Sequence, residues 1–192
     1  MCKIREVRTQ TLGYPRLRVT PGTMVALRYK ENGHITKPTA EKLSTGAVSV
    51  YGTAFPLPSD TLAHVHHVWN ANGTGGDGRG RLLRRTSFDD GSCYEANDSS
   101  LSKLRQQKPQ PPHDSIDGPN LLCWTSVPLP DNLTLGSLYT LYWVWDWPSA
   151  DLTTNSILKQ EVYTSCIDLD ISDLDRFEPS FAVDLADAHI VQ

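Results

Sequence analysis

The residues best placed to do chemistry lie near the end of the chain, in the run QEVYTSC. Here Glu161 and Tyr163 are two positions apart, and Cys166 follows three positions later. In a β-strand, residues two apart point to the same side, so a carboxylate and a phenol would lie next to each other. Such a pair suits the surroundings of a copper ion, and the cysteine can fix the strand by a disulfide. The plainer interpretation, which the pattern alone favours, is a core strand with an exposed Glu161.

A second group with chemical potential is the histidine cluster His64, His66 and His67, within LAHVHHVW. Interpreted as a strand over Leu62–Trp69, this run puts His64 and His66 on one face. Two imidazoles at that spacing can chelate a metal ion, and neutral histidine is the commonest metal ligand. The ordinary alternative is a set of surface or interstrand histidines, and the cluster could also face a substrate.

The acidic and glycine-rich segments carry weaker signals. The run NGTGGDGRG at 72–80 lacks Gly-Lys-Ser/Thr and is not a dinucleotide fingerprint, so we interpret it as a surface loop. Asp89 and Asp90 could approach the histidines or, with Asp77, form a calcium site from hard oxygen ligands. No Gly-x-Ser-x-Gly occurs, so nothing supports a serine hydrolase.

Short alternating runs separated by turn signals must position these residues. A short helix is expected near Ser100–Gln107. The pattern predicts an all-β protein, an immunoglobulin-like antiparallel β-sandwich with long loops, over residues 1–171, followed by an acidic C-terminal tail at 172–192. The predicted strands are Arg16–Thr20, Thr23–Lys30, Ala47–Ala54, Leu62–Trp69, Leu121–Val127, Tyr139–Pro148 and Gln160–Ile171.

Composition bounds the class of protein. The chain has 192 residues, 39% hydrophobic and 21% charged, as expected for one soluble globular domain. A net charge of −4 gives no basic field for nucleic acid or an anionic membrane. No apolar run is long enough to cross a membrane. We expect a monomer without nucleic-acid or membrane partners.

The four cysteines, Cys2, Cys93, Cys123 and Cys166, include no CxxC pair, which disfavours structural zinc and favours two disulfides. Residues alone leave three pairings open. Disulfides imply an oxidising compartment, and glycosylation sequons at Asn72, Asn97 and Asn132 agree with a secreted glycoprotein.

The N-terminal sequence MCKIREVR has no apolar stretch typical of a signal peptide. Two interpretations remain: a cytosolic protein with free thiols, or a chain whose natural N-terminus differs from the one given. We favour the second, and expect that the signal peptide is absent because the chain is truncated.

Four long runs resemble a group of fungal secreted proteins of unassigned function. The resemblance covers about Arg16 to Ile171. The runs are RYKENGHITKP at 28–38, VWNANGTGGDGRGRLL at 68–83, FDDGSCY at 88–94 and YTLYWVWDWP at 139–148.

A more distant similarity links QEVYTSC and the tryptophan-rich run before it to fungal lytic polysaccharide monooxygenases, which share [Glu or Gln]-x-Tyr-x-x-Cys near their C-terminus. That resemblance implies copper as cofactor and a polysaccharide or cell wall as partner. An active member oxidises C–H bonds at glycosidic linkages, using oxygen or peroxide and an external reductant. The alternative is a non-catalytic carbohydrate-binding β-sandwich protein of a cell wall or surface.

Carried over residue by residue, the resemblance makes His34 the second nitrogen ligand, Tyr163 the axial group and Glu161 the acid that orients bound oxygen. Catalysis would then rest on Glu161 and Tyr163, and His64 with His66 is the second choice for the metal. The first ligand in those enzymes is an N-terminal histidine, whereas this chain begins with Met1. We therefore expect the chain as written to lack its first strand and to be inactive.

The resemblance also suggests the disulfides. In the monooxygenases, the cysteine after the axial tyrosine pairs with one placed as Cys2 is here. This implies Cys2–Cys166 and leaves Cys93–Cys123 as the second bridge.

Overall fold

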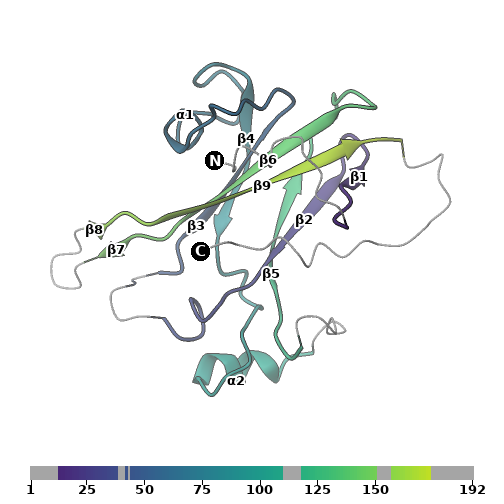
Figure 1. The fold of residues 1–192 in the computed structure, drawn as a ribbon. Coiled ribbons are helices and arrows are strands. Elements are labelled where there is room, and N and C mark those ends of the chain that lie inside the picture. The colour runs from purple at the N-terminus through teal and green to yellow at the C-terminus, as the bar shows by residue number, and fades with distance from the viewer. Residues whose placement is uncertain (1–12, 39–41, 43, 110–117, 151–156, 174–192) are drawn as a thin grey trace.

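The computed structural model describes residues 13–38, 42, 44–109, 118–150 and 157–173 (Figure 1). Within them the chain forms nine strands and two short helices. In chain order these are β1 (Leu17–Val19), β2 (Met24–Tyr29), β3 (Ala47–Thr53), α1 (Leu62–Val65), β4 (Gly80–Ser87), α2 (Ser100–Gln106), β5 (Cys123–Pro128), β6 (Leu138–Asp146), β7 (Ser149–Ala150), β8 (Ile157–Lys159) and β9 (Val162–Ile171).

The strands form an all-β sandwich, which confirms the predicted fold class. A five-stranded sheet has the order β1-β9-β6-β3-β4, and β2 pairs with β5 in a second sheet. The short β7–β8 hairpin continues β6 and β9 at one end of the molecule, while α1 and α2 lie at opposite ends (Figure 1).

One pairing departs from the prediction of an antiparallel sheet. β1 runs parallel to β9, with Leu17 opposite Leu169 and Val19 opposite Ile171. After these three residues the Pro21–Gly22 turn takes the chain into the other sheet. Because β1 and β9 are not joined by a hairpin, nothing in the connection requires them to run antiparallel.

The long strand β6 is buried almost throughout, because both of its faces are covered. One face packs against the β2–β5 sheet in the main hydrophobic core, and the other packs against α1 and its flanking turn. The side chains on the α1 side are Tyr51, Val65, Trp69, Tyr142 and Val144.

The prediction of a strand at 62–69 is wrong. Residues Leu62–Val65 form α1, and the amides of His66 and Trp69 donate to the carbonyls of Leu62 and Val65. The buried residues Val65 and Trp69 are four apart, the spacing of one helix face, and this period decides the local structure. His64 and His66 therefore do not share a strand face.

The short helix predicted near Ser100–Gln107 is confirmed as α2. Ser99 caps it, since the Ser99 hydroxyl accepts from the amide of Ser102 at 3.2 Å. The predicted acidic tail falls at 172–192, of which residues 174–192 lie outside the described part of the chain. Among the described helices, none has the length and apolar character needed to cross a membrane.

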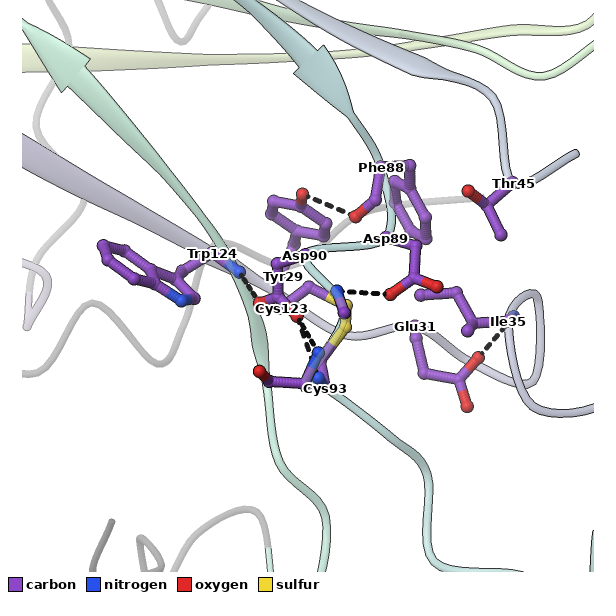
Figure 2. The surroundings of a disulfide bond; sticks show 12 residues. Tyr29, Glu31, Ile35, Thr45, Phe88, Asp89, Asp90, Cys93, Cys123 and Trp124 are labelled. Carbon is purple, nitrogen blue, oxygen red and sulfur yellow. Dashed lines mark hydrogen bonds between the residues drawn. A yellow bond between two sulfur atoms is a disulfide. The ribbon is translucent and has the colours of Figure 1, made fainter. Parts of the chain in front are cut away.

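The predicted disulfide Cys93–Cys123 is present and joins the loop after β4 to the start of β5 (Figure 2). Asp90 organises this junction, because its carboxylate accepts from the amides of Cys93 at 2.9 Å and Trp124 at 3.0 Å. Cys166 is also disulfide-bonded, and its predicted partner Cys2 lies outside the described residues.

Candidate functional site

The tryptophan-rich strand β6 builds two different environments, one on each face. On the face toward β2 and β5, which we call the aromatic face, Trp145 stacks with Phe88 at 3.9 Å between ring centroids. Trp147 and Tyr163 stack on Trp145 at 5.0 Å each. Alternation along β6 produces this face, because residues 143, 145 and 147 point the same way.

His34 reaches the aromatic face from the loop that follows β2. Its ring lies edge-on to Trp147, with centroids 4.4 Å apart, and 5.2 Å from Trp145. The sequence places it there through the buried carboxylate of Glu31, which accepts from the amide of Ile35 at 2.7 Å (Figure 2). The same carboxylate also accepts from the amide of Glu95 at 2.9 Å. A buried acid that binds the loop backbone in this way holds His34 in a fixed position.

The electrostatics around His34 keep its imidazole neutral. Burial lowers the pKa of His34, and the nearby Lys42 ammonium lowers it further against the opposing effects of three glutamates. Among the described residues, neither ring nitrogen of His34 has a hydrogen-bond partner. A neutral imidazole without a partner is the form that ligates a metal.

Tyr163 lies on this face in β9, and Glu161 immediately precedes that strand. Tyr163 pairs with Trp145 across the β6–β9 ladder, and the Trp147 amide donates to the Glu161 carbonyl at 2.8 Å. Cys166 packs on the opposite face. The three residues carried over from the monooxygenase pattern therefore converge on the same pair of tryptophans.

The carboxylate of Glu161 is already paired. Lys159 Nζ lies 2.6 Å from it, and Lys42 forms a second ion pair while its ammonium sits 3.8 Å above the Trp147 ring. These two ammonium groups, Lys159 first, lower the pKa of Glu161. The acid is thus ionised at neutral pH, with its charge balanced by neighbouring cations.

Copper fits this arrangement in part. The site offers a neutral imidazole and a phenol, but in the described part of the chain no cluster of three histidine, cysteine or carboxylate ligands includes His34. The Lys42 ammonium also opposes a second cation near Glu161.

The opposite face of β6 carries a second group, which we call the histidine–aspartate cluster: His66, His67 and Asp146. His66 Nε2 lies 3.0 Å from Asp146 Oδ1, and His67 Nε2 lies 3.8 Å from Asp146 Oδ2. The two imidazole rings are 3.8 Å apart between centroids. Tyr51 Oη lies 3.0 Å from His66 Nδ1 and so orients that ring.

The family assignment follows from a match that covers nearly the whole chain. The domain of unknown function DUF7492 matches residues 1–186. The chain belongs to this family. No curated protein and no solved structure matches it. The DUF7492 domain has no known function, so a function for this chain must be inferred from the residues on the two faces of β6.

The DUF7492 chain also has site residues that the sequence prediction missed. His64, a second-choice ligand, is exposed and is not a member of the histidine–aspartate cluster, whereas His67 is. Asp146 was not considered, although an acid inside an otherwise apolar strand is a signal. Lys42 gives no signal in the sequence, because it meets Glu161 only through the fold.

The aspartates considered for calcium are each engaged with the protein. Asp77 pairs with Arg79 at 2.7 Å, and Asp89 pairs with the buried Arg105 at 2.7 Å. The carboxylate of Asp90 accepts backbone amides. These contacts give all three acids structural roles.

Proposed function

We propose that this DUF7492 protein is a secreted copper-binding protein that resembles lytic polysaccharide monooxygenases, with its copper centre on the aromatic face of β6. With a full ligand set it would cleave polysaccharide oxidatively. One observation carries the proposal: His34 and Tyr163, 129 positions apart, both contact the ring of Trp145.

Each residue has a separate task in this proposal. His34 supplies a neutral nitrogen ligand, held by the Glu31 loop. Tyr163 would provide a phenol next to the ion, and Glu161 a carboxylate that could accept a proton beside the centre. Bound copper would supply one-electron chemistry with oxygen or peroxide, while the stacked tryptophans keep the centre rigid and exclude water from one side.

Copper titration of the protein, purified with its native N-terminus, tests the proposal. The wild-type protein and the His64→Ala control should bind Cu²⁺ with a dissociation constant below about one micromolar. His34→Ala should weaken binding at the aromatic face by about tenfold or more. His64 is a suitable control because it is an exposed histidine away from this face.

Two results would contradict the proposal. The first is copper affinity no tighter than micromolar in the wild-type protein. The second is a His34→Ala variant that binds copper as well as the wild-type protein, since no copper centre at the aromatic face then depends on His34.

Secretion is part of the proposal and predicts a glycan pattern. Asn72 and Asn132 are exposed, whereas the Asn97 amide nitrogen donates to Thr36 Oγ1 and to the Glu95 carbonyl, at 2.8 Å each. A glycan on Asn97 would break this pair of bonds. Mass spectrometry of protein from a secreting host should find glycans at Asn72 and Asn132 and none at Asn97.

A second candidate function is carbohydrate binding without catalysis, which one residue favours. Trp124 on β5 is 53% exposed, whereas Trp69 is 2% exposed and belongs to the core. In Figure 2 the Trp124 ring points away from the disulfide junction. An exposed tryptophan beside Arg28, its partner on β2, is suited to stacking on a sugar ring.

A pull-down with insoluble cellulose and chitin tests the second candidate. Trp124→Ala should abolish retention, while Met24→Ala, an exposed apolar residue on the same sheet, should leave it unchanged. Equal retention of the wild-type protein and Trp124→Ala would rule out Trp124 as the binding platform.

A further inference from the structure

The histidine–aspartate cluster brings three ligand atoms to the spacing of a metal site. Metal bonds of about 2.1 Å at a tetrahedral angle put ligand atoms about 3.4 Å apart. His66 Nε2 lies 2.9 Å and His67 Nε2 lies 3.8 Å from Asp146 Oδ2, on either side of that value. From this geometry we infer that His66, His67 and Asp146 form a second site, distinct from the aromatic face, for a divalent transition ion such as Zn²⁺.

The backbone at His67 is what brings the two imidazoles together. Neighbouring residues normally point apart, but His67 has φ of +60°, in the left-handed region that non-glycine residues seldom adopt. The His67 amide donates to Tyr51 Oη at 3.1 Å, which holds this turn. Such strain concentrates at ligand sites.

Asp146 supplies an independent sign that the cluster is incomplete. The residue is 9% exposed; the hydrogen bond from His66 goes to Oδ1, and the buried Oδ2 atom makes none to the described residues, although His66 Nε2 lies 2.9 Å from it. Oδ2 also faces both imidazoles. A carboxylate oxygen in this state is unfavourable by itself, and coordination to a cation would satisfy it.

The hydrogen bonds fix the tautomer of His66 in the metal-free protein. Because the Asp146 carboxylate can only accept, His66 carries its proton on Nε2 and donates it to Asp146 Oδ1. In the neutral ring, Nδ1 then accepts from Tyr51 Oη, which itself accepts from the His67 amide. A metal ion needs the lone pair of Nε2, so binding must move the imidazole proton to Nδ1.

Tyr51 and Ser49 can accommodate the move of the His66 proton from Nε2 to Nδ1. With Nδ1 protonated, Tyr51 Oη accepts from His66 and must donate its own proton elsewhere. Ser49, two residues earlier on the same face of β3, has a buried hydroxyl beside Tyr51, without a well-formed hydrogen bond among the described residues. The metal-bound tautomer can therefore strengthen the contact from Tyr51 to Ser49 Oγ, while the ion satisfies Asp146 Oδ2.

The ligand set selects the class of ion. Two imidazoles and one carboxylate suit borderline transition ions such as Zn²⁺, whereas Mg²⁺ and Ca²⁺ prefer oxygen ligands. The side chain of His67 is 58% exposed, so the ion can enter from solvent and keep an open position for water.

Calorimetric titration of the full chain with ZnCl₂ at about pH 7.5, where histidine is neutral, tests the site. We expect one Zn²⁺ per chain with a dissociation constant of about one micromolar or below. His67→Ala, which changes an exposed side chain, and the isosteric Asp146→Asn should each weaken binding about tenfold or more. MgCl₂ should give no binding in the same range.

Two control variants make the result decisive. His64→Ala changes an exposed histidine of the same segment, and His34→Ala changes the aromatic face; both should keep the wild-type affinity for Zn²⁺. Absence of zinc binding in the wild-type protein, unchanged affinity in His67→Ala, or equal losses in His64→Ala or His34→Ala would each overturn the inference.

Discussion

The two faces of β6 use the same strand for opposite kinds of environment. On the aromatic face the rings satisfy one another, and the acid Glu161 is paired with two lysines. On the other face a buried carboxylate oxygen of Asp146 makes no hydrogen bond to the described residues and lies beside two imidazoles.

This difference shows that sequence resemblance and local chemistry point to different places. The resemblance to monooxygenases leads to the aromatic face, where one imidazole stands without a full ligand set in the described residues. The geometry leads to the histidine–aspartate cluster, where three ligand atoms already converge. Variants that alter one face and leave the other intact can separate the two.

The largest expected effect is on stability. Trp145→Ala should lower the free energy of unfolding by about 3–5 kcal/mol, because a buried indole is lost together with its hydrogen bond to the Thr45 carbonyl. Val144→Ala, one residue away on the other face, should cost less, about 1–3 kcal/mol. Urea denaturation measures the free energy of unfolding of both variants. Equal losses would show that the aromatic face contributes no more to stability than the opposite face of β6.

Lys42→Met should change the electrostatics of the aromatic face alone. Loss of the ammonium should raise the pKa of both His34 and Glu161, since Lys42 lowers both. The lowered pKa of Glu161 contributes stability above its unfolded pKa that is lost as pH falls, so the variant should lose less stability in acid. Copper affinity should rise by a few-fold, as a cation is removed beside the proposed centre.

Lys159→Met is the matched control for this prediction. Lys159 also lowers the pKa of Glu161 but is not among the main influences on the pKa of His34. NMR titration of the histidine rings should therefore find His34 shifted in Lys42→Met and unshifted in Lys159→Met. If the pKa of His34 shifted equally in both variants, the prediction of a specific effect of Lys42 on His34 would be contradicted.

Asp146→Asn should act on the other face. Burial lowers the pKa of His66, and Asp146 partly opposes this effect. Without the carboxylate, the pKa of His66 should fall further, while His34 should titrate as in the wild-type protein. The same NMR titration measures both rings in one sample, and an unchanged His66 would contradict its pairing with Asp146.

The smallest expected effect is that of Ser49→Ala. Because Ser49 Oγ makes no well-formed hydrogen bond to the described residues, stability should change by less than about 0.5 kcal/mol. Zinc affinity should fall by about two- to fivefold, the equivalent of one hydrogen bond of roughly 0.5–1 kcal/mol. Calorimetry measures both quantities, and unchanged zinc affinity would show that Tyr51 does not turn to Ser49.

Period-two patterns predicted most of the fold, because alternation depends only on local sequence. The runs that became β2, β3, β5, β6 and β9 were found, as was the Cys93–Cys123 bridge. The run at 62–69 was misassigned because its adjacent histidines masked the helical spacing of Val65 and Trp69. The parallel pairing of β1 depends on long-range contacts that no local pattern contains.

The candidate sites were predictable to different degrees. Alternation in the run 160–171 predicts the strand that carries Tyr163, whereas Glu161 lies one residue before β9. The approach of Lys42 to Glu161 and of Asp146 to His66 joins residues 119 and 80 positions apart, which only the folded sheet can set. The turn at His67 has no sequence signal, since a histidine at positive φ is held by its bond to Tyr51.

The measurement that tests the account most directly is electron paramagnetic resonance of the protein titrated with Cu²⁺, in the wild-type form, His34→Ala and His67→Ala. Copper also favours imidazole ligands, so both faces should bind it. The account predicts two distinct signals in the wild-type protein, one lost in His34→Ala and the other in His67→Ala. A spectrum that His34→Ala leaves unchanged would contradict a copper centre on the aromatic face.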